Sequence, residues 1–457
     1  MNRISGRSWI VLLLVLAMVG GMAFFVVEFT ADAREWVFFD GSPHVYSGLK
    51  PADGILLDRE GKLLLDLSGD WTYAKDERVR MTTLHWVGDR LGNISAPILG
   101  RYTDEMTGYD LVNGLYAYAD EPGRMVLTLS AKVQAAALES MGEHRGTIAV
   151  YNYKTGEILC AVTTPTYDPD EVPDIAGDTT GAYEGVYLNR FVQATYTPGS
   201  IFKLVTAAAA LETIPDILDQ RFTCTGDLEI GGGTVSCEAA HGELDFENAL
   251  VYSCNCTFAQ IAELVGRKNM EKYVKKFGIT EPVSFDGITT ASGNFDAWDS
   301  ADVSFAWSCI GQFTDLVNPC QYLSFVGAIA NGGSGALPHI VREITVGGSR
   351  TYAADTEMTG RIMSVSAAQK LREMMGECVT IKYGAENFPD VTVCAKSGPA
   401  EKDGDAASNA MFTGFVDDPD YPLAFIVVVQ DGGYGSRTCV PIISQVLTVC
   451  MEVLDAE

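Results

Sequence analysis

Ser200 and Lys203 have the types and the spacing needed for nucleophilic chemistry. They stand three residues apart at the start of residues 200–212, a run of strong helix formers. Side chains at this spacing share one face of a helix, so a hydroxyl and an amine would be neighbours. The lysine can act as a base only when neutral, which requires burial or cationic neighbours that lower its pKa. Alternatively, Ser200 caps the helix and Lys203 is solvated.

Two further motifs favour the catalytic interpretation. Ser253 and Asn255 form an S-x-N motif before a helical pattern. Lys396, Ser397 and Gly398 form a K-[ST]-G motif after a strand pattern. Ser253 can pass a proton between a lysine and a leaving amine, and the Asn255 amide can hold a peptide backbone. Lys396 and Ser397 offer a charge and a hydroxyl to a carboxylate, while Gly398 lets a substrate lie against the strand. Taken singly, these residues are also typical of turns, caps and solvated strand ends.

The three motifs occur in the order found in penicillin-binding proteins and related β-lactamases. Their flanks sharpen the resemblance to penicillin-binding protein transpeptidases: residues 189–203 resemble the active-serine segment, residues 146–169 the opening hairpin and residues 311–333 a later helical landmark. The resemblance covers residues 124–457 well and residues 36–123 loosely. Because no glycosyltransferase domain is recognisable before residue 124, the chain is similar to the class B, monofunctional members.

The resemblance implies one cleft in which catalytic and substrate-binding side chains meet. The expected fold is α+β, the penicillin-binding serine transpeptidase fold, with an antiparallel sheet flanked by helices and a helical subdomain. The residues assigned by the resemblance are the nucleophile Ser200, its base Lys203, the cleft residues Ser253 and Asn255, and the carboxylate-binding group of Lys396, Ser397 and Gly398.

The implied reaction is peptidoglycan D,D-transpeptidation. The family releases the last D-alanine of a D-alanyl-D-alanine stem peptide, forms an acyl-enzyme and passes the acyl group to an amine of a neighbouring stem. β-Lactams imitate that substrate and would trap Ser200. The resemblance implies no metal or organic cofactor. It implies a membrane glycan polymerase as a partner, contacted through an anchor and residues 36–123.

One position departs from the family pattern. The residue after K-[ST]-G usually supplies a backbone N–H to the oxyanion hole, but here it is Pro399, which has no N–H. Loss of one such donor costs on the order of 10²–10³ in rate. Either another donor replaces it, or the strand shifts register, or the protein acylates slowly and works chiefly as a scaffold. Pro399 is also compatible with an ordinary edge-strand position.

The N-terminal segment predicts a membrane anchor. Residues 9–27 carry no charge and are long enough to nearly span the hydrocarbon layer, and Arg3 and Arg7 favour a cytoplasmic N-terminus. The alternative is a signal peptide cleaved near the small-residue site at residues 31–33. Both place the rest of the chain outside the cell. We therefore expect an anchor over residues 1–35, an accessory domain over 36–123 and a transpeptidase domain over 124–457.

Composition excludes several classes of protein. Apolar residues make up 47% of the 457-residue chain, so it can bury a large core. The net charge of −28 argues against nucleic-acid binding, which needs a basic face. No G-x-S-x-G, H-E-x-x-H or P-loop motif occurs, so an α/β-hydrolase, a zincin and a P-loop enzyme lose their main signals.

The eleven cysteines match neither a disulfide scaffold nor a zinc ribbon, because no C-x-x-C pair occurs. Cys224 and Cys237 flank a glycine-rich stretch and are the best candidates for a disulfide. Cys254 and Cys256 are expected to be buried, with cleft-lining thiols as the alternative. His241 is expected to be a structural hydrogen-bonding residue.

Periodicity predicts strands early and late in the chain with helices between them. The predicted elements are a hairpin at 54–65, a helix capped by Ser130, strands at 147–151 and 158–162, a mostly helical stretch at 245–335, strands at 391–395, 411–416 and 423–430, and a helix at 440–454. Such an order indicates one α+β domain whose sheet is closed by distant segments.

Two other functions compete with the transpeptidase hypothesis. A serine β-lactamase or β-lactam sensor uses the same motif trio, although the long N-terminal region and the anchor argue against a β-lactamase. A pseudo-enzyme that serves as a scaffold in a wall-synthesis complex is supported by Pro399.

Overall fold

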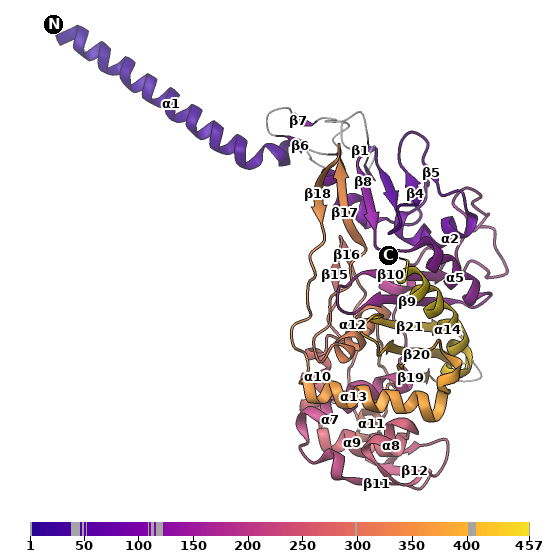
Figure 1. Cartoon of the computed structure of the whole chain (residues 1–457). Coiled ribbons are helices and arrows are strands. Elements are labelled where there is room, and N and C mark those ends of the chain that lie inside the picture. The colour runs from indigo at the N-terminus through magenta and orange to yellow at the C-terminus, as the bar shows by residue number, and fades with distance from the viewer. Residues whose placement is uncertain are drawn as a thin grey trace.

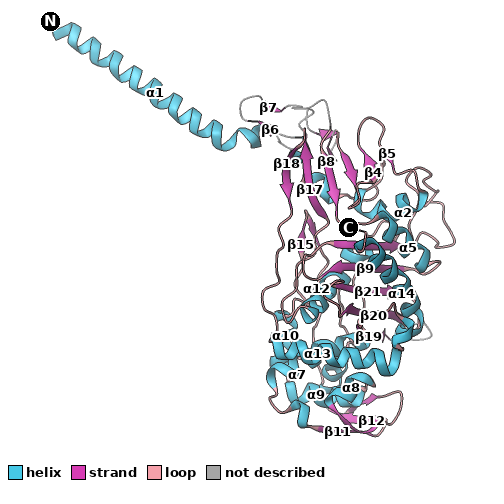
Figure 2. Cartoon of the chain, in the orientation of Figure 1, coloured by secondary structure: helices cyan, strands magenta, loops and turns pink. Residues whose placement is uncertain are grey.

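A five-stranded antiparallel sheet lies at the centre of the molecule (Figures 1 and 2). Its strand order is β10-β9-β21-β20-β19. The strands are β9 (Gly146–Asn152), β10 (Ile158–Thr164), β19 (Val393–Ala400), β20 (Asn409–Val416) and β21 (Leu423–Val429). The first hairpin thus joins the last strands through β9 and β21, as the sequence predicted. The computed structural model describes residues 2–37, 46–47, 50–51, 53–107, 109–110, 114–115, 122–297, 299–400 and 408–456.

Helices bury both faces of this sheet. Alternate strand residues point to opposite faces, so Ile148 and Val150 join one apolar cluster and Ala149 and Tyr151 the other. The covering helices are α5 (Ala131–Met141) and α14 (Gly435–Leu454) on the first face, and α12 (Pro319–Ala330) and α13 (Val365–Cys378) on the second. Burial on both sides explains the unbroken apolar runs of β9, β10 and β21, and it confirms the predicted α+β class.

A mostly helical part lies at the end of the molecule farthest from the N-terminal helix in Figure 1. It confirms the helical pattern predicted for residues 245–335. Its helices are α7 (Lys203–Thr213), α8 (Phe246–Val251), α9 (Asn255–Val265), α10 (Arg267–Lys276) and α11 (Asp302–Ile310), with 3₁₀ turns η1 (Gly199–Phe202) and η2 (Ile217–Asp219). The short helix α6 (Arg190–Gln193) instead lies against β9, β10 and α12. Small two-stranded sheets pair β11 (Arg221–Cys224) with β14 (Gly242–Asp245), β12 (Asp227–Ile230) with β13 (Gly233–Ser236), and β15 (Ser284–Phe285) with β16 (Ile288–Thr289).

A second sheet combines early and late segments. Its order is β18-β17-β8-β3-β4-β5, so residues from the predicted accessory region and from the predicted transpeptidase region share one sheet. Its members are β3 (Ile55–Leu57), β4 (Leu63–Asp66), β5 (Thr72–Tyr73), β8 (Arg124–Leu127), β17 (Val341–Val346) and β18 (Ser349–Ala353). The expected hairpin at 54–65 is confirmed as β3 and β4. The domain boundary between residues 123 and 124 stays a prediction.

Short elements complete the described chain. Helices α2 (Glu77–Val87), α3 (Pro97–Arg101) and α4 (Thr103–Thr107) lie in the early region, with two-residue strands β1 (Tyr46–Ser47), β2 (Lys50–Pro51), β6 (Tyr109–Asp110) and β7 (Gly114–Leu115). A π-helical turn, η3 (Val379–Tyr383), and a 3₁₀ turn, η4 (Ala385–Asn387), follow α13. The predicted cap is confirmed, since Val133 N–H donates to Ser130 Oγ at 3.4 Å.

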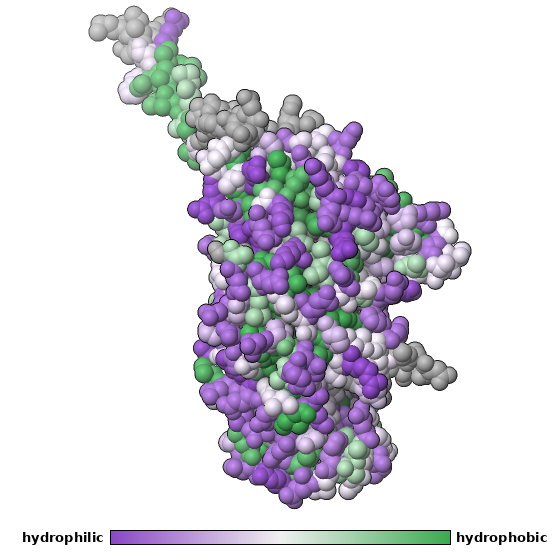
Figure 3. Space-filling model, turned by 45° about the vertical axis from the view of Figure 1, so that its right-hand side comes forward, coloured by the Kyte–Doolittle hydropathy of each residue, from purple (hydrophilic) through white to green (hydrophobic). Residues whose placement is uncertain are grey.

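Helix α1 (Asn2–Val37) projects away from the rest of the chain (Figure 1), and its large apolar side chains between residues 9 and 27 are exposed (Figure 3). Its segment Gly6–Ala33 has 28 residues and is long and apolar enough to cross a membrane. The predicted span at 9–27 lies inside this segment, and the helix continues without a break through residues 31–33. Helix α14 is also long enough to cross a membrane, but it is less apolar than α1 and packs on the central sheet as a core helix.

Candidate active site

The predicted nucleophile lies on a turn that is fixed from two sides. Ser200 belongs to the 3₁₀ turn η1, which leads directly into α7. The Tyr322 hydroxyl donates to Ile201 O at 2.6 Å, and Gly199 N–H donates to Gly311 O at 2.8 Å. No side-chain capping bond from Ser200 forms at either helical element, so the interpretation of Ser200 as a helix cap is wrong.

Two glycines allow other elements to approach this turn. A Cβ on Gly398 would lie 2.7 Å from Pro198 O and 2.8 Å from Ile201 N. A Cβ on Gly311, whose φ is +90°, would lie 2.2 Å from Gly199 O. Both positions therefore exclude side chains because backbone packs against them. The predicted contact of Gly398 with substrate stays a prediction, but the structure gives this glycine a second role in seating β19 against η1.

Lys203 is fully buried beside Ser200. Its Nζ lies 3.0 Å from Ser200 Oγ and is surrounded by three oxygens of the S-x-N motif: Ser253 O at 2.6 Å, Asn255 Oδ1 at 2.7 Å and Ser253 Oγ at 3.2 Å. Burial, and next the charge of Lys396, lower the pKa of Lys203 to about 7. The interpretation of Lys203 as a solvated surface residue is therefore wrong.

The oxygens around Lys203 orient the neutral amine for proton acceptance. The two shortest contacts are to a backbone carbonyl and an amide oxygen, which can only accept hydrogen bonds. A neutral amine has two hydrogens, and these two acceptors use both of them. Its lone pair is then left for a hydroxyl, and Ser200 Oγ is the nearer of the two hydroxyls. Asn255 is oriented for this because its Nδ2 donates to Ser236 O at 2.9 Å.

Ser253 connects the two motif lysines. Its Oγ lies 3.2 Å from Lys203 Nζ and 3.0 Å from Lys396 Nζ. Ser253 has a φ of +54°, a left-handed conformation that L residues with side chains seldom adopt. Such strain is tolerated where the surroundings fix the residue, and it aims the Ser253 hydroxyl between the two amines.

Lys396 is buried behind the cleft. Its Nζ donates to Ser397 O at 2.8 Å in addition to its contact with Ser253, and burial lowers its pKa to about 8. The structure thus brings the three motifs together: each lysine contacts the same serine hydroxyl.

Tyr383, which no motif marked, positions Ser397. Ser397 N–H donates to Tyr383 Oη at 2.9 Å, and the two hydroxyls lie 2.9 Å apart. Tyr383 ends the π-helical turn η3, and burial raises its pKa, so the phenol stays protonated. The sequence carries no signal for this residue because the turn has no recognisable pattern.

Pro399 lies on the open edge of the sheet. Strand β19 is the edge strand of the central sheet, and its pairing with β20 runs from Val393 to Ala400 without a bulge. Ser397 N–H points off the sheet toward Tyr383. Residue 399 is two positions further along the strand, so its backbone has the same orientation and an N–H there would also point away from β20. The absence of this N–H therefore removes a donor from the open edge but breaks no hydrogen bond between strands.

The motif residues line a cleft of about 240 Å³. Ser200, Ser253, Asn255 and Ser397 face it, while Lys203 and Lys396 lie behind it. Further lining residues outside the three motifs include Trp307, Gln312, Lys382, Tyr434 and Ser436. A larger cavity of about 980 Å³, bordered by Trp71, Arg90 and Leu91, shares no residue with this cleft and lies among the early elements.

The predicted Cys224–Cys237 disulfide is wrong, because both thiols are free. Instead, Cys237 Sγ lies 3.9 Å from Cys254 Sγ and 3.4 Å from His241 Nδ1, so its thiol shares several partners. Burial of Cys254 and Cys256 is confirmed. His241 contacts two thiols and lines the rim of the cleft.

Comparison with known proteins agrees with this geometry. Peptidoglycan D,D-transpeptidase PbpA of Mycolicibacterium smegmatis is 28% identical over 338 residues, which cover 68% of this chain and 68% of the relative. Stage V sporulation protein D of Bacillus subtilis is 29% identical over 348 residues, covering 71% of this chain and 52% of the relative. This chain thus spans about half the length of the second relative.

Solved structures show the same fold. A D,D-transpeptidase domain from Eggerthella lenta has a TM-score of 0.75 at 23% identity and covers 89% of this chain and 99% of its own. Penicillin-binding protein A from M. tuberculosis, solved as a ceftriaxone acyl-enzyme complex, has a TM-score of 0.74 at 23% identity. The match covers 87% of this chain and 98% of the solved chain. The profile of the penicillin binding protein transpeptidase domain matches residues 146–448. Since this match spans well over half of the chain, the protein belongs to the penicillin-binding protein transpeptidase family.

Proposed function

We propose that the protein is a peptidoglycan D,D-transpeptidase of the class B type, acting through an acyl-enzyme on Ser200. The observation that supports this best is the position of Lys203. Its buried amine has a pKa near neutrality, lies 3.0 Å from Ser200 Oγ and has its hydrogens directed at two acceptors. This arrangement supplies a base for a serine nucleophile without a histidine.

In the acylation step, Lys203 takes the Ser200 proton while Oγ attacks the carbonyl carbon of the penultimate D-alanine. The peptide C–N bond then breaks, and the leaving D-alanine amine needs a proton. Ser253 Oγ, between the two lysine amines, can hand over its own proton and recover one from Lys203. The product is a Ser200 ester and free D-alanine.

In the second step an amine of a neighbouring stem peptide attacks the ester. The C–Oγ bond breaks, a new amide forms, and the amine proton returns through the same relay to Ser200. Asn255 would bind the backbone of the donor peptide. Ser397, which faces the cleft, would bind the terminal carboxylate, with the positive charge of Lys396 behind it. β-Lactams would acylate the same oxygen.

The apolar exposed helix α1 supports a single-pass anchor that places the cleft outside the cytoplasm, near the wall substrate. A membrane glycan polymerase is the partner proposed for the anchor and the early region. Helices α9 and α11, which carry residues of the cleft, lie at the other end of the molecule from α1 (Figure 1).

A labelled penicillin tests the proposal on the full chain in detergent. We expect a stable covalent label that Ser200→Ala abolishes and that Ser436→Ala, a serine lining the same cleft, retains. A label that survives Ser200→Ala would exclude the mechanism. Steady hydrolysis of a chromogenic cephalosporin without a lasting adduct would instead assign a β-lactamase. Full complementation of a deletion strain by Ser200→Ala would assign a scaffold.

A further inference from the structure

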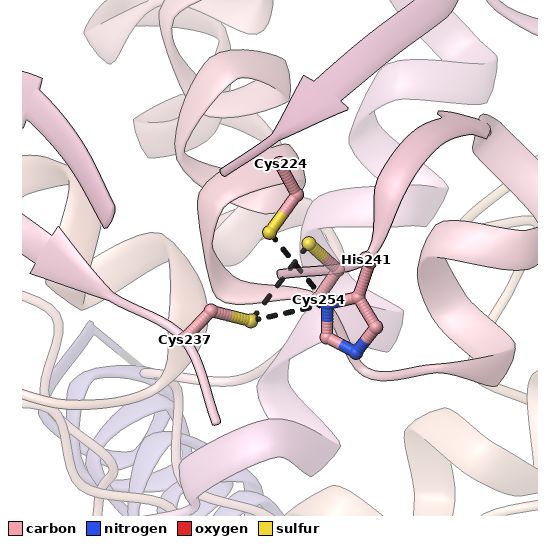
Figure 4. Close-up of side chains that lie close together, drawn as sticks. All are labelled: Cys224, Cys237, His241 and Cys254. Carbon is pink, nitrogen blue, oxygen red and sulfur yellow. Dashed lines mark hydrogen bonds between the residues drawn. The ribbon is translucent and has the colours of Figure 1, made fainter. Parts of the chain in front are cut away.

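Four side chains of metal-binding type converge beside the S-x-N motif (Figure 4). Cys224 ends strand β11, Cys237 follows β13, His241 precedes β14, and Cys254 is the N-cap of α9. Their three sulfurs and the His241 Nδ1 atom all lie within 4.8 Å of one another. Among the described residues this is the group of histidine, cysteine and acidic side chains that could hold a metal ion.

Three of the six distances between the four ligand atoms match the edges of a tetrahedron around zinc, and the other three are no longer than 4.8 Å. Zinc binds sulfur at about 2.3 Å and histidine nitrogen at about 2.0–2.1 Å, so the ligands of a tetrahedral site lie about 3.8 Å (S···S) and about 3.6 Å (S···N) apart. Here Cys237 Sγ lies 3.9 Å from Cys254 Sγ, and His241 Nδ1 lies 3.6 Å from Cys224 Sγ and 3.4 Å from Cys237 Sγ.

We propose that Cys224, Cys237, His241 and Cys254 bind one zinc ion in a closed tetrahedral site that holds the S-x-N turn in place. Four protein ligands leave no open position for water or substrate, so the ion is structural. Three thiolates and one imidazole favour zinc over magnesium or calcium, which prefer oxygen ligands.

The local fold consists of small sheets, which contact the main apolar core through Phe222, Ile230 and Val235. Residues 221–245 form two separate two-stranded sheets, and isolated two-stranded sheets are marginally stable in water. The buried cluster beneath them consists of Cys224, Leu244, Cys254 and Cys256, so most of its members are cysteines. An ion bound by residues from both chain ends of this region and from α9 would join the sheets to the helix.

Backbone donors are already directed at two of the sulfurs. Asn255 N–H donates to Cys237 Sγ at 3.3 Å, and Thr257 N–H donates to Cys254 Sγ at 3.4 Å. Bonds of this kind orient thiolate ligands and offset their charge in metal sites. The second bond is the N-cap bond of α9, so the same sulfur that would bind the ion also begins the helix.

The site is covalently continuous with the catalytic machinery. Cys254 stands between Ser253, whose hydroxyl contacts both lysines, and Asn255, whose amide oxygen contacts Lys203. The ion would therefore fix both neighbours of Cys254, including the left-handed backbone of Ser253. Loss of the ion should displace the proton relay without touching any catalytic atom.

Elemental analysis of the full chain, purified in detergent under reducing conditions, tests the site. We expect about one zinc per chain, as for other four-ligand sites, and a loss to below about a tenth in Cys224→Ser and His241→Ala. The matched control is Cys256→Ser, which changes a buried cysteine of the same cluster outside the ligand set and should keep the zinc. Zinc lost equally from the control would overturn the assigned ligands.

Cobalt substitution makes the test independent of whether the variants fold. Wild-type chain stripped with a chelator should take up Co²⁺ and show the visible absorption of tetrahedral thiolate coordination. Stripping should also slow penicillin acylation several-fold, and zinc should restore it. Wild-type protein that holds no zinc and takes up none, or that carries a Cys237–Cys254 disulfide in its place, would overturn the proposal. Unchanged acylation after stripping would overturn the link to Ser253.

Discussion

Tyr383 and Ser397 are joined by two hydrogen bonds of 2.9 Å, one through the Ser397 N–H and one between the hydroxyls. We expect Tyr383→Phe to slow acylation by penicillin about tenfold, because it leaves the Ser397 N–H without its acceptor and frees the Ser397 hydroxyl. The loss should be larger for a penicillin with a free carboxylate than for its ester, since Ser397 is proposed to bind the carboxylate. The measurement is the second-order acylation constant.

Tyr434→Phe is the control, because Tyr434 lines the same cleft but is 59% exposed. It should change neither constant more than twofold. Equal losses for the acid and the ester in Tyr383→Phe would contradict a positioning role and indicate general destabilisation.

The two lysines predict a bell-shaped pH profile of acylation. The rate should rise as the pH passes about 7, because Lys203 then loses its proton and becomes a base. It should fall above about 8, because Lys396 then loses the charge proposed to attract the carboxylate. Because the two amines interact, the apparent pKa values of the two limbs describe the coupled pair and not either lysine alone. Lys396→Arg should move the alkaline limb upward, and a flat profile between about pH 6 and pH 9 would contradict both assignments.

The missing backbone donor at Pro399 predicts a gain of function. Pro399→Thr and Pro399→Ala both restore an N–H at the open edge of β19, and we expect either to speed acylation by on the order of 10–100-fold. Stopped-flow acylation by a fluorescent penicillin measures this. A gain with threonine alone would assign the effect to its hydroxyl. Equal rates in all three proteins would show that another group already binds the oxyanion.

Gly398→Ala should damage both stability and acylation. Its Cβ would meet backbone atoms of the nucleophile turn at 2.7 and 2.8 Å, and such overpacking costs about 1–3 kcal/mol. The control is Gly376→Ala in the neighbouring helix α13, where a Cβ would meet only Cys394 Sγ at 3.5 Å. That change should leave the free energy of unfolding equal or higher by ~0.5–1 kcal/mol. Thermal denaturation compares the two, and similar melting temperatures would contradict the packing argument.

The sequence predicted the members of the site better than their environment. The motifs located Ser200, Ser253 and Asn255, which are the hydrogen-bond partners of the Lys203 amine, because the chemistry demands fixed residue types at fixed spacings. The sequence could not show that Lys203 and Lys396 are both fully buried, since burial depends on segments far away in the chain. The sequence did not predict the role of Tyr383, because that role depends on one π-helical turn after α13.

The cysteine prediction failed for a spatial reason. Sequence proximity around a glycine-rich stretch suggested that Cys224 and Cys237 pair, but β11 and β13 also bring their thiols to His241 and Cys254. No C-x-x-C pair marks these ligands, because each comes from a different element. The central strands were predicted well, since their apolar runs are bounded by turn residues, although β19 extends beyond the predicted 391–395. Parts of the accessory region at 36–123 lie outside the described residues.

The sheet shared by β3, β8 and β17 has a practical consequence for anyone preparing a soluble fragment. A protein started at residue 124 would keep β8 but lose β3, β4 and β5, so β8 would present a row of bare amides and carbonyls to the solvent. Strands of other molecules can pair with such an exposed edge, so the fragment would aggregate. Removal of residues 1–52, which takes away α1, β1 and β2, leaves this sheet complete.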